Sequence, residues 1–348
     1  MHMADALLAP AVAATMYVAS GTAAGISIHR LKKDDEPQKL PTMAVTSALV
    51  FAGQMINYTI PGTGSSGHMC GGMLLSALLG PQAGFLSMIV ILTIQCLFFA
   101  DGGLMALGAN VWNMAFYGCF VGYYLIWRPL MQSKSGLSTR VRIIVASILG
   151  CVLTLQLGAF SVVLETTLSG ITELPFGAFL ALMQPIHLAI GLIEGVVTAA
   201  VLVFVYESRP ELLRDVDASA ATTRRSLKST LAILVVVVAI VGGGLSLVAS
   251  SNPDGLEWAL FGNEEAGYSA NMGLDEEDFG VSSGVADTAG AIQEATSFLP
   301  DYAFADSDSA AGTTVSGLVG SAMVAGVAVL ICFAGGFFRK KKTASHTD

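Results

Sequence analysis

The run PGTGSSGHMCGG, Pro61 to Gly72, lies between two long apolar segments and carries no charged residue. Glycine, proline and serine at this density favour a loop over a helix. Its one strongly coordinating side chain is the imidazole of His68. We interpret the stretch as the mouth of a bundle of membrane helices, because the apolar segments on either side must then be separate elements that meet at this loop.

The composition is that of a membrane protein. The 348 residues are 53% hydrophobic and 12% charged, with a mean hydropathy of +0.67, whereas a soluble domain has roughly 25% charged residues. The five cysteines show no CxxC spacing, which argues against a disulfide framework and a zinc ribbon. The first residues, MHMADALLAP, lack the basic region of a signal peptide, so we expect the amino terminus to stay intact.

The apolar segments predict an all-α integral membrane fold. A seven-helix bundle with one short helix occupies residues 1–228, including a basic linker at 207–228, and a two-helix unit occupies residues 229–348. Segments long enough to span, or nearly span, a bilayer run approximately over 7–28, 42–60, 84–100, 106–126, 143–164, 176–206, 231–250 and 315–338. The run 69–79, short and flanked by glycine, is expected to be a partial helix that descends from the His68 loop.

The basic residues test this map. All 17 fall into four groups: Arg30, Lys32, Lys33 and Lys39; Arg128, Lys134, Arg140 and Arg142; Arg209, Arg214, Arg224, Arg225 and Lys228; Arg339, Lys340, Lys341 and Lys342. With nine passes and an outside amino terminus, every group is cytoplasmic, as the positive-inside rule requires. The prediction is a multi-pass protein of the cell membrane with an extracytoplasmic amino terminus and a cytoplasmic carboxyl terminus.

The segment 251–312 has a different composition, with thirteen carboxylates and no lysine or arginine. Such a segment attracts cations, but it is also typical of a solvated, partly disordered spacer. We expect an extracytoplasmic loop that is mainly a spacer, and an added role in funnelling cations stays open.

Together with His68, the first two residues of the chain suggest a specific metal site. A free α-amine on Met1, the amide nitrogen of His2 and the His2 imidazole can bind one metal through two fused chelate rings. A nitrogen of His68 would complete a square-planar set, which suits Ni²⁺ or low-spin Co²⁺ and disfavours tetrahedral zinc. Initiator methionine is usually retained before a residue as bulky as histidine, so the amine is expected to be available.

Polar side chains near this mouth predict a supporting network. Asp101, Asn110 and Asn113 interrupt apolar sequence, and Asn57 lies on the second predicted helix, near its end. Polar groups at membrane depth normally face the bundle interior and bond to one another or to loop backbone. We expect these four residues, with Gln54 and Gln95, to hold the His68 loop; direct ligation by Asn or Asp is the alternative. The roles of Glu194 and His187, seven residues apart on one helix face, stay open.

The run GTGSSGHM, Gly62 to Met69, resembles the phosphate-binding pattern GxxxxGK(S/T), but histidine replaces its lysine and methionine replaces its hydroxyl residue. The chain is therefore not expected to hydrolyse ATP. Two other functions remain in view: an intramembrane metalloenzyme using His68 with Asp101 or Glu194, and a self-sufficient secondary carrier. The first would need an open coordination position for activated water.

Four motifs, in this order, resemble one known family. Met1-His2, GTGSSGHMCGG, FADGGLMALGANVWNM and IEGVVT look like the substrate-binding membrane subunit of cobalt and nickel energy-coupling factor (ECF) transporters, the CbiM/NikM family. The match spans most of residues 1–206. PDGLEW, Pro253 to Trp258, with the apolar segment that follows, resembles the small companion component of these systems, the CbiN/NikN or PDGLE type, fused to the same chain.

The resemblance implies a transport subunit that is not itself an enzyme. Its substrate would be Ni²⁺ or Co²⁺, held by Met1, His2 and His68, with no organic cofactor. Its partners would be a membrane coupling (T) subunit, a pair of ATPase (A) subunits and membrane lipid, and no nucleic acid. The sequence departs from the family in the residues after His2, where MADALL keeps an acidic residue, Asp5, but lacks the glycine that often follows it.

Overall fold

The computed structural model describes residues 1–32, 39–134, 136–171, 173–217, 225–268, 272, 274, 279–304 and 311–335. Several charges used in the topology prediction or in the prediction for the acidic segment lie outside the described residues. They are Lys33, Arg224, the carboxyl-terminal basic run 339–342, and the loop carboxylates Asp275, Glu276, Glu277, Asp278, Asp306 and Asp308.

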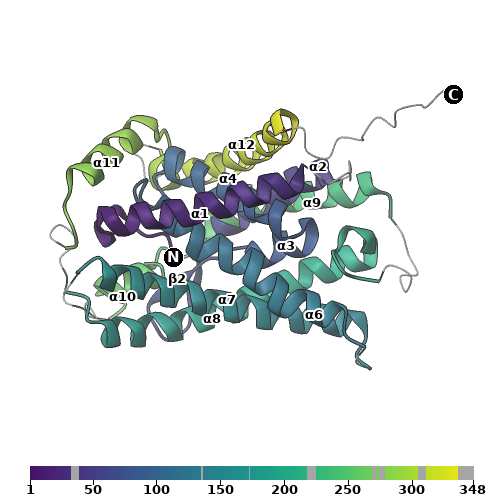
Figure 1. The fold of residues 1–348 in the computed structure, drawn as a ribbon, viewed down its shortest axis with the longest axis horizontal. Helices are drawn as coiled ribbons and strands as arrows, with labels where there is room; N and C mark the ends of the chain where they lie inside the picture. The colour runs from purple at the N-terminus through teal and green to yellow at the C-terminus, as the bar shows by residue number, and fades with distance from the viewer. Residues whose placement is uncertain are drawn as a thin grey trace.

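The predicted all-α membrane fold is confirmed. Its helices lie side by side along the long axis of the molecule (Figure 1). The first unit contains η1 (Asp5–Leu7), α1 (Pro10–Leu31), α2 (Lys39–Gln54), α3 (Gly72–Leu79), α4 (Pro81–Phe99), α5 (Leu107–Asn110), η2 (Val111–Trp127), α6 (Arg128–Met131), α7 (Thr139–Leu168), α8 (Phe176–Ser208) and η3 (Pro210–Leu212). The elements α5, η2 and α6 follow one another without a break, and η2 has π-helical hydrogen bonding.

Five of the described helices are long and apolar enough to cross a membrane: α1, α4, α7, α8 and α12 (Ala311–Gly335). The shorter α9 (Leu227–Gly243) is also apolar. Of the 18-residue apolar stretch that qualifies each helix as a membrane span, only 17% is buried in α1, compared with 72% in α4. α4 is therefore central in the bundle, whereas α1 presents most of its apolar surface to its surroundings.

The two helices of the carboxyl-terminal unit pack on the first unit through α2. The pair α9 and α12 cross where Gly242 and Gly317 meet, and a side chain at Gly317 would collide with the backbone oxygen of Gly242. The Ser321 hydroxyl of α12 reaches the backbone oxygen of Ala48 in α2 at 3.5 Å. The two units therefore form one helical body.

A short hairpin delivers the His68 loop to the bundle. Strands β1 (Tyr58–Ile60) and β2 (Ser65–Gly67) pair antiparallel, with Tyr58 opposite Gly67. The turn between them uses positive φ angles at Gly62 and Gly64, which glycine adopts without steric cost. The chain then enters α3, which is buried along its whole length and is the short helix that the sequence predicted near residues 69–79.

The acidic segment is folded where the structure describes it, and the spacer expected from its composition is wrong for those residues. It follows η5 (Leu245–Val248) and contains α10 (Gly255–Phe261), α11 (Gly284–Thr296) and η6 (Pro300–Tyr302). In Figure 1, α10 and α11 lie at the end of the bundle opposite the carboxyl terminus. The Gln293 side chain of α11 donates to the backbone oxygens of Cys96, at 3.0 Å, and Gly102, at 2.6 Å.

Candidate metal site

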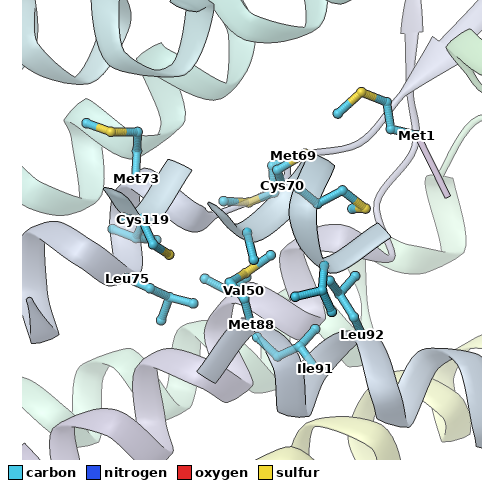
Figure 2. Close-up of a cluster of buried hydrophobic side chains, with 14 of the residues drawn as sticks. Met1, Val50, Met69, Cys70, Met73, Leu75, Met88, Ile91, Leu92 and Cys119 are labelled. Carbon is cyan, nitrogen blue, oxygen red and sulfur yellow. The ribbon is translucent and has the colours of Figure 1, made fainter. Parts of the chain in front are cut away.

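The amino terminus is anchored inside the protein. The side chain of Asn110 pairs with both backbone groups of Met3: the Met3 N–H donates to Oδ1 at 2.7 Å, and Nδ2 donates to the Met3 oxygen at 3.1 Å. The Gly103 N–H also donates to the Met3 oxygen, at 2.9 Å. Met1 is only 5% exposed, and Figure 2 shows its side chain near a cluster that includes Met69, Cys70 and Met73.

Two buried side chains hold the loop that carries His68. The carboxylate of Glu194, on α8, accepts the backbone N–H of Cys70 at 2.8 Å and that of Gly71 at 2.9 Å. The Gln54 side chain donates to the Cys70 oxygen at 2.7 Å. Both backbone groups of Cys70 are thus fixed by side chains from α2 and α8, which sets the position of the imidazole two residues earlier.

The two anchored segments bring the imidazoles of His2 and His68 into a stack, with ring centroids 5.2 Å apart and an interplanar angle of 21°. His68 Nδ1 lies 3.1 Å from the Met69 oxygen. Since a carbonyl oxygen only accepts, Nδ1 carries the proton and Nε2 presents a lone pair. His2 Nδ1 lies 3.0 Å from Asp101 Oδ1.

Asp254 joins the carboxyl-terminal unit to this site. Its Oδ2 lies 2.9 Å from the α-amine of Met1 and 4.0 Å from Nε2 of His68. Its Oδ1 caps the start of α10 by accepting the N–H groups of Leu256, at 2.7 Å, and Glu257, at 2.9 Å. One carboxylate therefore serves two purposes, since one oxygen starts a helix and the other lies between two nitrogens of the candidate site.

The electrostatics favour metal coordination by the rings. Burial, reinforced by the nearby Met1 ammonium, lowers the pKa of His2 to about 3 and that of His68 to about 4. Both imidazoles are therefore neutral near pH 7, as a metal ligand must be. Burial acts to lower the pKa of the Met1 amine, but the charge of Asp254 outweighs it and raises that pKa. Burial acts to raise the pKa of Asp254, and the Met1 ammonium with His68 outweighs it and lowers that pKa.

Two donors of the candidate site are paired with carboxylates in this structure. The Met1 amine is paired with Asp254, and the His2 ring with Asp101. Among the described residues, no three His, Cys, Asp or Glu side chains are placed to hold a metal ion together. Binding of a metal by the Met1 amine would require Asp254 to leave that amine.

The residues of the predicted polar network lie around the amino terminus more than around the His68 loop. Asp101 contacts His2 and accepts the hydroxyl of Tyr302, Asn110 holds Met3, and the side chain of Asn113 donates to Glu165 at 2.8 Å and to the Met3 sulfur at 3.6 Å. Asn57 lies in the loop after α2, where its backbone oxygen accepts the N–H of Ser250 at 2.7 Å.

Sequence reasoning missed Asp254. The motif Asp254-Gly-Leu-Glu257 is a capping box, which signals a helix start. That signal predicts α10, but nothing in it places the carboxylate beside a residue 253 positions earlier in the chain. The role of Glu194 was also open, because periodicity reveals a helix face and not the backbone that the face contacts.

The fold and the site define a membrane metal transporter. The model of the cobalt uptake substrate-specific transmembrane region, CbiM, matches residues 2–212, and that of the PDGLE domain matches residues 228–335. The chain therefore belongs to the CbiM family, as the four motifs predicted, with a PDGLE domain fused behind it, as the motif PDGLEW predicted.

Individual relatives agree with this assignment. The chain is 35% identical to a protein of Archaeoglobus fulgidus provisionally named fused nickel transport protein NikMN, over 93% of this chain and 95% of that one. It is 32% identical to the fused nickel transport protein NikMN of Rhodobacter capsulatus, with the same coverage. A crystal structure of a truncated transition metal transporter matches 60% of this chain and 99% of its own, with 31% identity and a TM-score of 0.52.

Proposed function

We propose that this chain is the substrate-capture component of an ECF-type importer of Ni²⁺ or Co²⁺, with the ion held by four nitrogens in a plane. The donors are the Met1 amine, the His2 amide, the His2 imidazole and His68. The observation that carries the proposal is the meeting of the buried Met1 amine and His68 at one oxygen, Asp254 Oδ2, at 2.9 and 4.0 Å.

The donor set decides the class of ion. Imidazole and amine nitrogens suit nickel, cobalt and copper, whereas Mg²⁺ and Ca²⁺ require oxygen ligands. Chelation through the His2 amide uses Nδ1 of the same residue, because only that ring nitrogen closes a six-membered ring. Nδ1 faces Asp101 in this structure. Loading therefore requires the His2 ring to leave Asp101 and the amine to leave Asp254.

The approach to the site is acidic. A cavity of 1370 Å³ opens beside His2 and is lined by carboxylates of both units, including Asp101, Asp254, Glu257 and Asp301. A concave surface of one sign of charge raises the local concentration of the opposite ion. The acidic segment thus gathers cations at the extracytoplasmic face in this scheme, with the amino terminus on that side.

Energy for transport comes from other chains. No phosphate-binding loop is present in the sequence, so ATP hydrolysis falls to a pair of ATPase subunits, coupled through a membrane T subunit. The exposed apolar surface of α1, with open space at Gly21 and Gly25, provides a face on which a membrane helix can pack closely.

The decisive experiment blocks the amine and then restores it. The full chain is made with an amino-terminal tag followed by a protease site whose cleavage leaves Met1 as the first residue. We expect tight nickel or cobalt binding, measured by calorimetry on the purified protein, to be absent before cleavage and to appear after it. The visible absorption of square-planar nickel should appear with it. Undiminished binding by the tagged chain would refute the proposal.

A ligand variant adds an independent test. His68→Ala should abolish metal binding and uptake while membrane insertion is unchanged, and His29→Ala, which removes an exposed imidazole at the far end of α1, should change neither. Uptake by this chain alone in vesicles with a proton gradient and no ATPase would favour a secondary carrier over an ECF component.

A further inference from the structure

His187 is a buried imidazole that the capture site does not use. It lies on α8 and is 1% exposed. Its Nδ1 donates to the backbone oxygen of Met183 at 2.7 Å, one helical turn earlier. Nδ1 therefore carries the proton, and Nε2 has a lone pair. That atom is buried and has no hydrogen-bond partner in the part of the chain that the structure describes.

A small cavity lies between this imidazole and the capture site. Its volume is about 10 Å³, and Met1, His68, Cys70, His187 and Asp254 all line it. A cavity of this size has room for about one water molecule or one bare ion and for no organic ligand. Gly255 is part of the wall, and a Cβ there would stand 3.3 Å from the His187 ring, so the start of α10 closes this side of the cavity.

We propose that His187 is a ligand of a second, inner metal position, which takes a divalent ion of the nickel and cobalt class from the capture site. The proposal rests on the proposed function, because the ion must first be captured. The available donors are Nε2 of His187, the thiol of Cys70 and the carboxylate of Asp254, whereas His68, in the same wall, stays with the captured ion. Imidazole and sulfur donors select such ions over Mg²⁺ and Ca²⁺.

The inner position is suited to transit and not to storage. Among the described side chains, no three His, Cys, Asp or Glu residues form a finished cage. An ion that must move on needs a site that binds it weakly enough to release it. A second cavity of about 10 Å³ is lined by Met1 and Cys70, which it shares with the first, and also by Met73, Asn113 and Glu194. Glu194 lies seven residues beyond His187, about 10 Å further along α8.

The test separates capture from passage in the full chain with its transport partners. Nickel binding is measured by calorimetry on the purified protein, and nickel uptake is measured in cells. His187→Ala should keep the tight first equivalent of nickel, lose the weaker second equivalent, and reduce uptake at saturating nickel roughly 10-fold or more. His29→Ala is the matched control and should leave all three quantities unchanged.

A direct readout of coordination uses cobalt. In His187→Cys protein with two equivalents of Co²⁺, the added thiolate should give a new sulfur-to-cobalt charge-transfer absorption beyond any that Cys70 gives in wild type or in His29→Cys. This readout also decides the question if His187→Ala does not fold. An unchanged second equivalent and unchanged uptake in His187→Ala, or no new absorption in His187→Cys, would overturn the inner position. Failure of the first equivalent in wild type would instead overturn the proposed function.

Discussion

Replacing Asp254 by asparagine should release the amino terminus of the metal-free protein while α10 stays folded. Asparagine is as good a helix cap as aspartate, so its oxygen can keep the bonds to Leu256 and Glu257. Its amide nitrogen then faces the Met1 ammonium, and a donor stands opposite a donor. The ion pair at 2.9 Å is lost without loss of the cap.

The size of the effect follows from the kind of bond. A hydrogen bond to a charged group contributes about 1.5–3 kcal/mol, and this pair lies in a largely buried place, where the Met1 side chain is only 3% exposed. Each 1.4 kcal/mol is a factor of ten in an equilibrium constant. The population of protein with its amine released should therefore rise about 10- to 100-fold in Asp254→Asn.

The assay is the rate at which a water-soluble acylating reagent modifies the Met1 α-amine in the full chain without metal. It is followed by mass spectrometry of the amino-terminal peptide near pH 7. Between the ordinary pKa values of 3.8 for Asp254 and 8.0 for the amine, both charges are present in wild type, because the first pKa is lowered and the second is raised. The pair is lost as the pH falls through the folded-state pKa of Asp254 or rises through that of the amine.

Glu257→Gln is the matched control. Glu257 accepts the Asp254 N–H within the same capping box and lies one turn away, but no hydrogen bond or ion pair described for it reaches Met1. This variant should be acylated at the wild-type rate. Equal rates in wild type and Asp254→Asn would show that Asp254 does not hold the amine, and the account of the metal-free site given above would then be wrong.

Two further substitutions test the anchors of the site. Asn110→Ala removes both side-chain bonds to the backbone of buried Met3, so nickel affinity measured by calorimetry should fall roughly 10- to 100-fold; an unchanged affinity would argue against anchoring by Asn110. Glu194→Gln turns an amide N–H₂ toward the N–H of Cys70 or Gly71. It should destabilise the purified protein by about 1–3 kcal/mol, whereas Glu173→Gln on the exposed surface should be neutral in the same thermal unfolding experiment.

The long helices could be predicted because a membrane helix is recognised by its length and its apolar composition. The short α3 could be predicted from charge parity, since a run of eight residues does not reveal itself by length. The hairpin at residues 58–67 could not. Its strands are three residues each, and Ser65, Ser66 and Gly67 have little β-propensity, so their extended form depends on contacts such as the bond from the Ser66 N–H to the Pro253 oxygen at 2.8 Å.

The structure of the acidic segment could not be predicted either, because it also depends on tertiary contacts. Its composition predicts a spacer, because thirteen carboxylates without a lysine or arginine are typical of a solvated segment. The few apolar residues nevertheless carry the packing: Leu256, Trp258 and Leu260 are each less than 10% exposed, and caps at Asp254 and Ser283 start the two helices. The approach of Asp254 to Met1 is a tertiary event that no local pattern encodes.

The contacts of the metal-free protein explain how the proposed site can discriminate between classes of metal ion. Asn110 fixes the segment that carries His2, and Gln54 with Glu194 fixes the segment that carries His68. Binding therefore costs little ordering of the chain. In the proposed four-nitrogen site, an incoming ion must instead take the amine from Asp254 and the His2 ring from Asp101. An ion that prefers oxygen gains nothing from that exchange, whereas one with high affinity for nitrogen gains four bonds. The two carboxylates thus act as competitors that only a nitrogen-seeking metal can displace.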